Sequence, residues 1–167
     1  AIARVMKGSF SAARDGKAII TRNPASFRFI EDGRYRILFG SSRVPRDGEE
    51  VSGDSYTFKS GLPGQAILSL SDGMGSGQAA SEDSEKVMEL TEQLLGTGFS
   101  ARSALKLVNT VLLLTGQNDR PATLDLCLVD LYSGVAEAMK LGAVASFIMG
   151  RDGVEVLESE HVPAGVM

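Results

Sequence analysis

Two aspartates lie where a hairpin would bring them together. Asp54 opens a run of alternating polar and apolar residues, and Asp72 closes a second one. The turn segment Ser60–Gly64 separates the runs, which predicts a β-hairpin. With the turn centred on Pro63, Asp54 lies opposite Asp72, and opposite residues share a face with Cβ atoms about 4.5–5.5 Å apart. The apolar residues of that face are predicted to be core, with the aspartates at its rim: Tyr56, Phe58, Leu68 and Leu70.

Two carboxylates this close repel each other unless a positive charge offsets them. Neither aspartate has a Lys or Arg directly beside it in sequence. Magnesium and manganese prefer carboxylate and carbonyl oxygens, so a divalent cation would suit the pair, and the Gly73 carbonyl could add a ligand. The spacing also allows a structural interpretation, in which Asp72 caps the next helix and Asp54 only ends a strand.

Other residues with chemical potential give weaker signals. The segment Gly73–Gly77 precedes a helix like a phosphate-binding loop, but it lacks both the G-x-G-x-x-G spacing and the Gly-Lys-Ser/Thr of a P-loop. A nucleotide-binding domain therefore stays an alternative. His161 is predicted to lie at the surface, and Cys127 to be a small buried hydrophobe rather than a nucleophile. Asp125 and Asp130 flank the strand of Cys127; Asp130 suits a turn start, and Asp125 has no predicted partner.

Composition limits the classes of protein. The chain has 167 residues, which suits one domain, and 43% of them are hydrophobic. A net charge of −4 without a basic cluster argues against nucleic-acid binding. One cysteine cannot form an internal disulfide, which favours a reducing, cytoplasmic location. No apolar run approaches the roughly 20 residues of a membrane helix, and no signal peptide is evident, so we expect a soluble domain.

The order of predicted elements indicates an α+β domain. Strands are predicted at residues 2–9 and 34–41, followed by the hairpin. Two helices, Gln78–Leu95 and Ala101–Leu114, show apolar stripes at helical spacing, which include Val87 and Leu90 in the first. Further strands are predicted at 123–131, 135–141, 145–150 and 154–157. We expect an antiparallel sheet covered by the helical pair.

The motifs together resemble a known family. Ser52-Gly-Asp-Ser-Tyr56 and Leu70-Ser-Asp-Gly-Met-Gly75 are similar to the two metal-binding motifs that open the phosphatase domain of stage II sporulation protein E, within the PPM (protein phosphatase 2C-like) family. The similarity runs from about Val44 to the chain end. Later segments occur in the same order as in that family: Thr123-Leu-Asp-Leu126, Val129-Asp-Leu131, Lys140-Leu-Gly142, Ala145-Ser-Phe-Ile148 and Val162-Pro-Ala-Gly165.

The resemblance implies an αββα sandwich of antiparallel sheets flanked by helices, with two manganese or magnesium ions at one edge. Asp54 and Asp72 match metal ligands of the family, and Gly73 matches its backbone-carbonyl ligand. The implied activity is hydrolysis of phosphoserine by metal-activated water, without a catalytic protein side chain. The implied partner is a phosphorylated anti-anti-sigma factor, which controls a sporulation sigma factor. Relatives carry membrane helices upstream, so the parent protein is expected to be membrane-tethered with this domain in the cytoplasm.

One departure from the family pattern concerns the later metal ligands. The family has a second Ser-Asp-Gly element and a terminal Asp-Asp element, and neither occurs here; Asp152-Gly153 lies in a predicted turn. We therefore expect residues 1–167 to form a single phosphatase domain that is incomplete at its C-terminus, and a partner-binding module without catalysis is the alternative. The exposed sheet edge could pair with a second copy as a homodimer. Because the first helix directly follows Asp72 and Gly73, we expect Val87 and Leu90 to belong to a regulatory helix.

Overall fold

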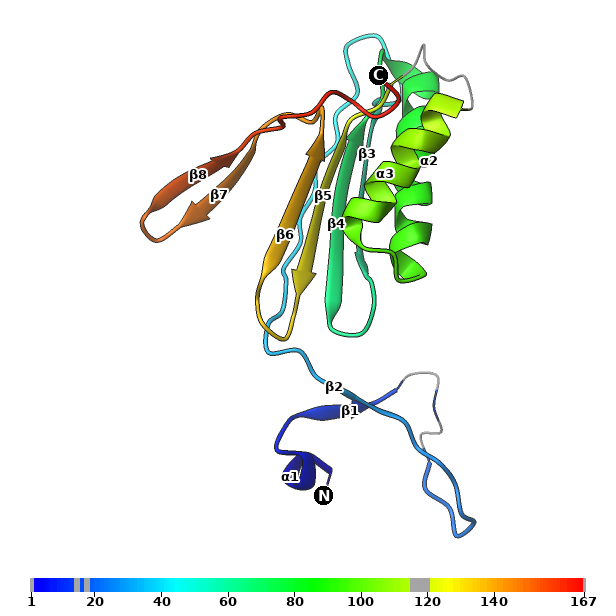
Figure 1. Cartoon of the computed structure of the whole chain (residues 1–167), viewed down its shortest axis with the longest axis vertical. Coiled ribbons are helices and arrows are strands. Elements are labelled where there is room, and N and C mark those ends of the chain that lie inside the picture. The colour runs from blue at the N-terminus through cyan, green and yellow to red at the C-terminus, as the bar shows by residue number, and fades with distance from the viewer. Residues whose placement is uncertain (1, 14–15, 17–18, 115–120, 167) are drawn as a thin grey trace.

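The computed structural model describes residues 2–13, 16, 19–114 and 121–166. Its centre is a four-stranded antiparallel sheet in the order β3-β4-β5-β6, with α2 and α3 packed on one face (Figure 1). Two-stranded sheets β1-β2 and β7-β8 lie outside it. The elements are α1 (Ile2–Met6), β1 (Phe10–Ala12), β2 (Phe29–Glu31), β3 (Asp54–Ser60), β4 (Gln65–Asp72), α2 (Gly77–Gly96), α3 (Ala101–Leu114), β5 (Leu124–Asp130), β6 (Ala136–Leu141), β7 (Ser146–Gly150) and β8 (Gly153–Leu157).

The hairpin and the helical pair form as predicted. Asp54 pairs with Asp72, and the register continues to Ser60 opposite Ala66. The helix predicted over 78–95 extends by one residue at each end, and the second helix has the predicted bounds. Ser100 caps the second helix, because its Oγ accepts a hydrogen bond from the Ser103 amide at 3.2 Å. The four later strands are also present within one or two residues.

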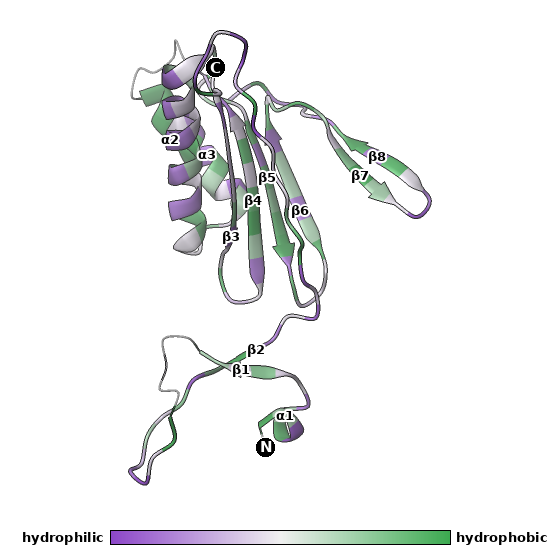
Figure 2. Cartoon of the chain, turned by 180° about the vertical axis from the view of Figure 1, so that it is seen from behind, coloured by the Kyte–Doolittle hydropathy of each residue, from purple (hydrophilic) through white to green (hydrophobic). Residues whose placement is uncertain are grey.

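The core lies between the helices and one face of the sheet. Val87 of α2 and Val108 of α3 are fully buried against the β5 side chains Leu124 and Leu126. Apolar residues at helical spacing give each helix one apolar face, and the opposite face is polar, as the alternating colours of α2 in Figure 2 show. Burial of this face positions the helices on the sheet.

The face of the hairpin that the helices cover differs from the prediction. Ser55, Ser69 and Ser71 point toward the helices and are 5%, 5% and 0% exposed, together with Ile67. The predicted core face is the open one: Tyr56, Phe58 and Leu70 are 42%, 37% and 42% exposed. The loop before β3 packs on part of this face, where the Phe39 ring stacks on Phe58 with centroids 4.8 Å apart. We call this surface the open face.

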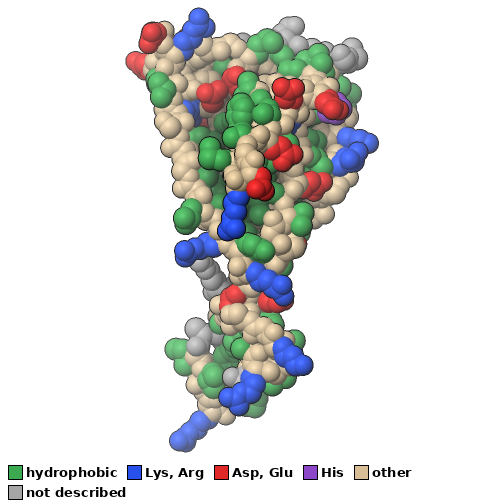
Figure 3. Space-filling view, turned by 90° about the vertical axis from the view of Figure 1, so that its left-hand side faces the viewer, with side chains coloured by type: hydrophobic (Ala, Val, Ile, Leu, Met, Phe, Trp, Pro, Cys, Tyr) green, Lys and Arg blue, Asp and Glu red, His purple; other side chains and the backbone are tan. Residues whose placement is uncertain are grey.

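The N-terminal region departs most from prediction. Residues 2–9 contain a short helix instead of a strand, and residues 34–41 form a loop. Among the described residues, no strand pairs with either segment, and β-forming residues alone do not make a strand without such a partner. Residues 1–46 hold ten Lys and Arg against three Asp and Glu, whereas residues 47–167 hold seven against eighteen. The net charge therefore conceals a basic region, whose Lys and Arg surround the lower part of the molecule in Figure 3.

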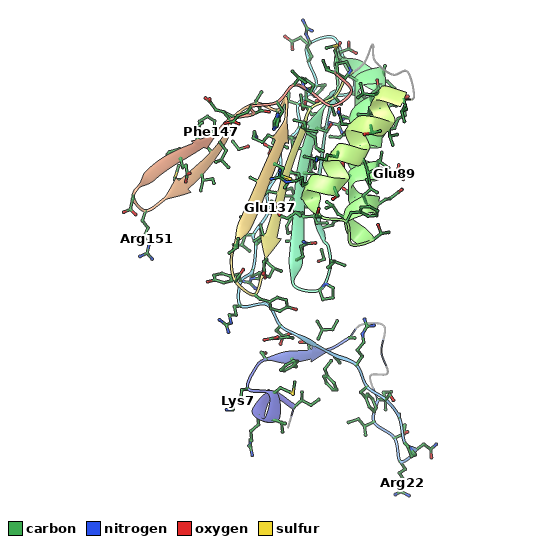
Figure 4. All side chains as sticks on the ribbon, viewed as in Figure 1. Lys7, Arg22, Glu89, Glu137, Phe147 and Arg151 are labelled. Carbon is green, nitrogen blue, oxygen red and sulfur yellow. The ribbon has the colours of Figure 1, made fainter. Side chains whose placement is uncertain are left out.

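Strands β7 and β8 form an arm that projects from the sheet beyond β6 (Figure 1). We call these two strands the β7–β8 arm. Their register places four apolar side chains on one face of the arm: Phe147, Met149, Val154 and Val156. Figure 4 shows Phe147 on this arm and Arg151 at its tip. Among the described residues, no helix has the length and apolar character needed to cross a bilayer.

Candidate metal site

Asp54 and Asp72 face each other across the first two strands of the sheet. They occupy the ends of β3 and β4, where the predicted register places both carboxyl groups on the open face. Asp54 is partly buried, and Asp72 is more exposed. The Ser52 hydroxyl donates a hydrogen bond to Asp54 Oδ2 at 3.1 Å, so the Asp54 carboxyl is oriented locally. The pairing predicted from sequence is thus present in the structure.

The two carboxyl groups form an electrostatically unfavourable pair. The pKa of Asp72 is raised above its usual value, first by desolvation, then by the charge of Asp54 and a hydrogen bond between the two side chains. Burial and a neighbouring like charge both disfavour ionisation. A cation between the carboxyl groups would reverse both effects, because it would favour two ionised carboxylates. The chemistry of the pair therefore fits a divalent cation.

Glycines bring the backbone of the site against α2. A Cβ on Gly73 would lie 2.0 Å from the Ala80 carbonyl oxygen, and a Cβ on Gly53 would lie 2.9 Å from the Ala80 side chain. No side chain fits at Gly73 unless α2 moves away. The absence of a side chain is therefore required at the position that resembles the family's carbonyl ligand.

Thr123, directly before β5, fixes the backbone of Asp72 from the other side. The Asp72 amide donates to Thr123 Oγ1 at 2.9 Å, and the Thr123 amide donates to the Asp72 carbonyl at 2.9 Å. The Ser71 hydroxyl also donates to the Thr123 carbonyl at 2.7 Å. Two hydrogen bonds thus hold the Asp72 backbone and a third holds its neighbour Ser71, and we identify Thr123 as a supporting residue that the sequence analysis missed.

Helix α2 is bonded directly to the Asp54 side of the site. The Ser84 hydroxyl donates to the Gly53 carbonyl at 2.8 Å and lies 2.8 Å from Ser55 Oγ. Arg43 contacts the Ser52 carbonyl and donates to Ser81 Oγ at 2.9 Å. A displacement of α2 would therefore move both segments that carry the aspartates.

The glycine-rich segment before α2 is already next to an acidic side chain. Ser76 Oγ donates to Glu49 Oε1 at 2.8 Å, and a Cβ on Gly77 would lie 2.4 Å from Glu49 Oε2. A carboxylate at a helix N-terminus is favourable, because the helix dipole is positive there. A phosphate would have to displace Glu49, which weighs against the nucleotide-binding alternative.

Most of the remaining candidates lie where their predicted roles require, but Cys127 is only partly buried, not fully buried as predicted, because its side chain lies on the face of β5 opposite the core residues Leu126 and Leu128. His161 is exposed, and the pKa of the Cys127 thiol is raised by burial and by the charge of Asp125, which disfavours the reactive thiolate. Asp130 accepts the Tyr132 amide at 2.7 Å in the β5–β6 turn. Asp125, for which no partner was predicted, is ion-paired with Lys140.

The regulatory candidates lie on the core side of α2. Val87 is 1% exposed within the core, and Leu90 is partly buried against it. Neither side chain contributes a polar group to the Asp54–Asp72 pair. In the part of the chain that the structure describes, no group of three or more acidic, His or Cys side chains is placed to hold a metal ion. The site there consists of two carboxylates and the backbone at Gly73.

Comparison with known proteins gives a consistent family assignment. The model of the Stage II sporulation protein E (SpoIIE) family matches residues 63–167. The Stage II sporulation protein E of Priestia megaterium is 30% identical over 161 residues, which cover 91% of this chain and 28% of that protein. Its counterpart from Bacillus subtilis (strain 168) is 32% identical over 133 residues, covering 80% of this chain and 16% of that protein. The chain thus spans less than a third of the length of each of these relatives.

Solved structures agree with the fold. The PP2C phosphatase domain of Bacillus subtilis SpoIIE, with a fragment of its regulatory domain, matches with a TM-score of 0.76 and 26% identity; the match covers 98% of this chain and 49% of that one. The serine/threonine phosphatase Stp1 of Staphylococcus aureus matches in fold with a TM-score of 0.61 at 17% identity. The chain has part of the PP2C phosphatase fold, and it belongs to the Stage II sporulation protein E family.

Proposed function

We propose that this chain is part of a metal-dependent protein phosphatase domain that removes phosphate from a phosphoserine of a partner protein. The carrying observation is the Asp54–Asp72 pair on the open face, with the pKa of Asp72 raised by desolvation and by Asp54. Family membership supports phosphatase chemistry, and PP2C-like phosphatases generally use manganese or magnesium. Similarity to the phosphatase domain of Bacillus subtilis SpoIIE, a cell fate determinant with a regulatory domain, supports a regulatory phosphoprotein as substrate, and we propose a phosphorylated anti-anti-sigma factor.

The residues of this chain would prepare the site rather than attack the substrate. Asp54 and Asp72 would supply negative charge for the cations, and the Gly73 carbonyl would add a backbone oxygen. Thr123 holds the Asp72 backbone, so the carboxylate needs little reorganisation when the substrate arrives. When bound, the two divalent cations would offset charge on the phosphoryl group and lower the pKa of the attacking water.

Hydrolysis of a phosphoserine protein by the 167-residue chain tests this proposal. We expect manganese-dependent phosphate release from a serine-phosphorylated anti-anti-sigma factor and from p-nitrophenyl phosphate, with loss of both activities in Asp54→Asn and Asp72→Asn. Asp152→Asn is the matched control, because it removes one carboxylate at the exposed tip of the arm. Equal rates in the two site variants and the control would contradict the proposal.

Partner binding without catalysis is the competing function, and the lack of a third acidic ligand among the described residues supports it. A chain that binds the phosphorylated partner but releases no phosphate at any manganese concentration would favour this alternative.

We place the domain in the cytoplasm, with a parent protein tethered to the membrane, and we keep a homodimer as a proposal. Size-exclusion chromatography with light scattering tests the homodimer.

Helix α2 is the proposed regulatory element. Ala80 lies against the backbone at Gly53 and Gly73, and Ser84 bonds to the Gly53 carbonyl, so a shift of α2 would alter the metal site. We expect Val87→Ala and Leu90→Ala to change manganese affinity as well as stability. Val108→Ala in α3 is the matched control, because its equally buried side chain lies on the other helix. If the α2 variants lower stability alone, the regulatory proposal fails.

A further inference from the structure

A second charged cluster lies on the open face, joining the sheet to the β7–β8 arm. Lys140 of β6 is 9% exposed, and its ammonium contacts the carboxylate of Asp125 on β5. The ammonium also donates to Ser146 Oγ at 2.7 Å, and the Ser146 hydroxyl donates to Asp125 Oδ2 at 2.5 Å. Each of the three side chains therefore contacts the other two.

Strand register places this cluster next to the acidic pair. Leu70 lies opposite Asp125, and Asp125 lies opposite Lys140. Asp72 is two positions beyond Leu70 on β4, so its side chain shares the open face with Asp125. Diagonal neighbours of this kind are about 7–8 Å apart. The cluster thus lies diagonally behind one of the two proposed metal ligands.

Strand β5 connects the cluster to the metal site. Thr123, the residue directly before β5, holds the Asp72 backbone, and Asp125, two residues later and within β5, holds Lys140. At the other end of the cluster, Ser146 is the first residue of β7, so the bond fixes the root of the arm. Beyond the other end of the arm, the His161 carbonyl accepts a hydrogen bond from the Gly142 amide, directly after β6, at 2.9 Å. The arm root and Asp72 are therefore both bonded to residues 123–125.

A buried ion pair by itself is weak evidence for a stabilising role, because desolvation offsets much of the Coulomb attraction. What distinguishes this one is its position between a proposed metal ligand and the arm. We propose that Asp125, Lys140 and Ser146 are positioning residues of the metal site, which hold the arm root and β5 in the geometry that Asp72 requires. This inference rests on the proposed function and adds residues to the same site.

The test compares Lys140→Met, the double variant Lys140→Met/Asp125→Asn and the control Lys59→Met. Lys59 forms another cross-element ion pair, with Glu92 of α2, away from the open face. Three quantities are measured for each 167-residue chain: the free energy of unfolding, amide hydrogen exchange of metal-free protein at residues 146–148 and Asp72, and manganese affinity. Lys140→Met leaves Asp125 as an unpaired, partly buried charge, whereas the double variant removes that charge as well. The double variant therefore separates the cost of an unpaired charge from the loss of the contact that positions the arm root and β5.

We expect Lys140→Met to speed exchange at the arm root and at Asp72 and to weaken manganese binding about tenfold or more, the usual effect of losing a group that orients a metal ligand. The double variant should recover stability but not exchange protection or manganese affinity. The proposal is overturned if Lys140→Met matches Lys59→Met in exchange and affinity, or if the double variant recovers all three quantities. If the wild-type chain binds no manganese, the proposed function fails separately, and the exchange result alone decides the positioning role.

Discussion

The two faces of the four-stranded sheet are built from the same strands but differ in what completes them. On the helix-covered face, small side chains such as Ser71 and large ones such as Leu126 are both fully buried. The open face carries larger apolar side chains that stay partly exposed, with Asp54, Asp72 and the Asp125–Lys140 pair between them. The comparison teaches that stability comes mainly from one face, whereas the groups able to do chemistry lie on the other.

The largest expected effect is a difference in stability between substitutions on the buried face and substitutions on the open face. Leu126 is 0% exposed and Leu70 is 42% exposed, although their strands are adjacent. We expect Leu126→Ala to lower the free energy of unfolding by about 2–5 kcal/mol, because it removes buried apolar contacts and leaves a cavity. Leu70→Ala should cost less than about 1 kcal/mol. Urea unfolding measures both, and equal losses would contradict the assignment of the core to the helix-covered face.

The next effect concerns the contact between the site and α2. A Cβ on Gly73 would meet the Ala80 backbone at 2.0 Å, so we expect Gly73→Ala to lower stability by about 2–4 kcal/mol through overpacking. Gly96→Ala is the control, because a Cβ there meets nothing within 4 Å at the end of α2. Thermal unfolding of both variants checks this. If Gly73→Ala leaves stability unchanged, α2 can move away from Gly73 at little cost.

A smaller effect should follow from removing one hydrogen bond at the edge of the open face. Thr123→Val keeps the side-chain shape but leaves the Asp72 amide without its acceptor, which should cost about 1–2 kcal/mol. Thr123→Ser retains the hydroxyl and should recover most of that loss. Chemical unfolding of the three proteins measures the difference. If Val and Ser behave alike, the hydroxyl does not hold Asp72.

The smallest effect is a pH dependence of the metal-free chain. A free aspartate has a pKa of about 3.9, and the pKa of Asp72 is raised by desolvation and by Asp54. Between the pKa of Asp72 in the unfolded chain and its higher pKa in the folded chain, the folded chain binds more protons than the unfolded chain. The free energy of unfolding therefore falls as pH rises through that window. Asp72→Asn removes this loss and should be more stable than wild type above the window, by about 0.2–1 kcal/mol.

Unfolding in the presence of a chelator, from pH 4 to pH 7, measures this difference. Asp152→Asn should follow the wild-type curve, because that carboxylate is exposed at the arm tip. If the free energy of unfolding of wild type changes with pH in parallel with that of Asp72→Asn, the two carboxyl groups do not repel each other.

The hairpin register and the helical pair could be predicted because they depend on local signals. Alternation and the turn at Pro63 suffice to place Asp54 opposite Asp72. The face on which the helices pack could not be predicted from alternation, because it depends on hydrogen bonds between distant residues. Ser84 of α2, for example, bonds to Ser55, so small polar side chains occupy the interior.

The partner of Asp125 was only nearly within reach of the same reasoning. The strands on either side of the turn at residues 132–134 were predicted, but pairing them about the centre of that turn, Ser133, would place Asp125 opposite Leu141, one residue from its observed neighbour Lys140. Ser146 could not be found in this way, because the arm root comes close only through the path of the chain after Gly142. The N-terminal strands failed because β-forming residues need a neighbouring strand, which sequence alone does not supply.

Manganese binding to the 167-residue chain, followed by isothermal titration calorimetry, tests the central claim most directly. Wild type, Asp54→Asn, Asp72→Asn and Asp152→Asn are titrated under identical conditions. The account predicts binding by wild type and Asp152→Asn and no measurable binding by either site variant. Equal binding by all four proteins, or no binding by wild type at millimolar metal, would contradict the claim that Asp54 and Asp72 form a metal site in this chain.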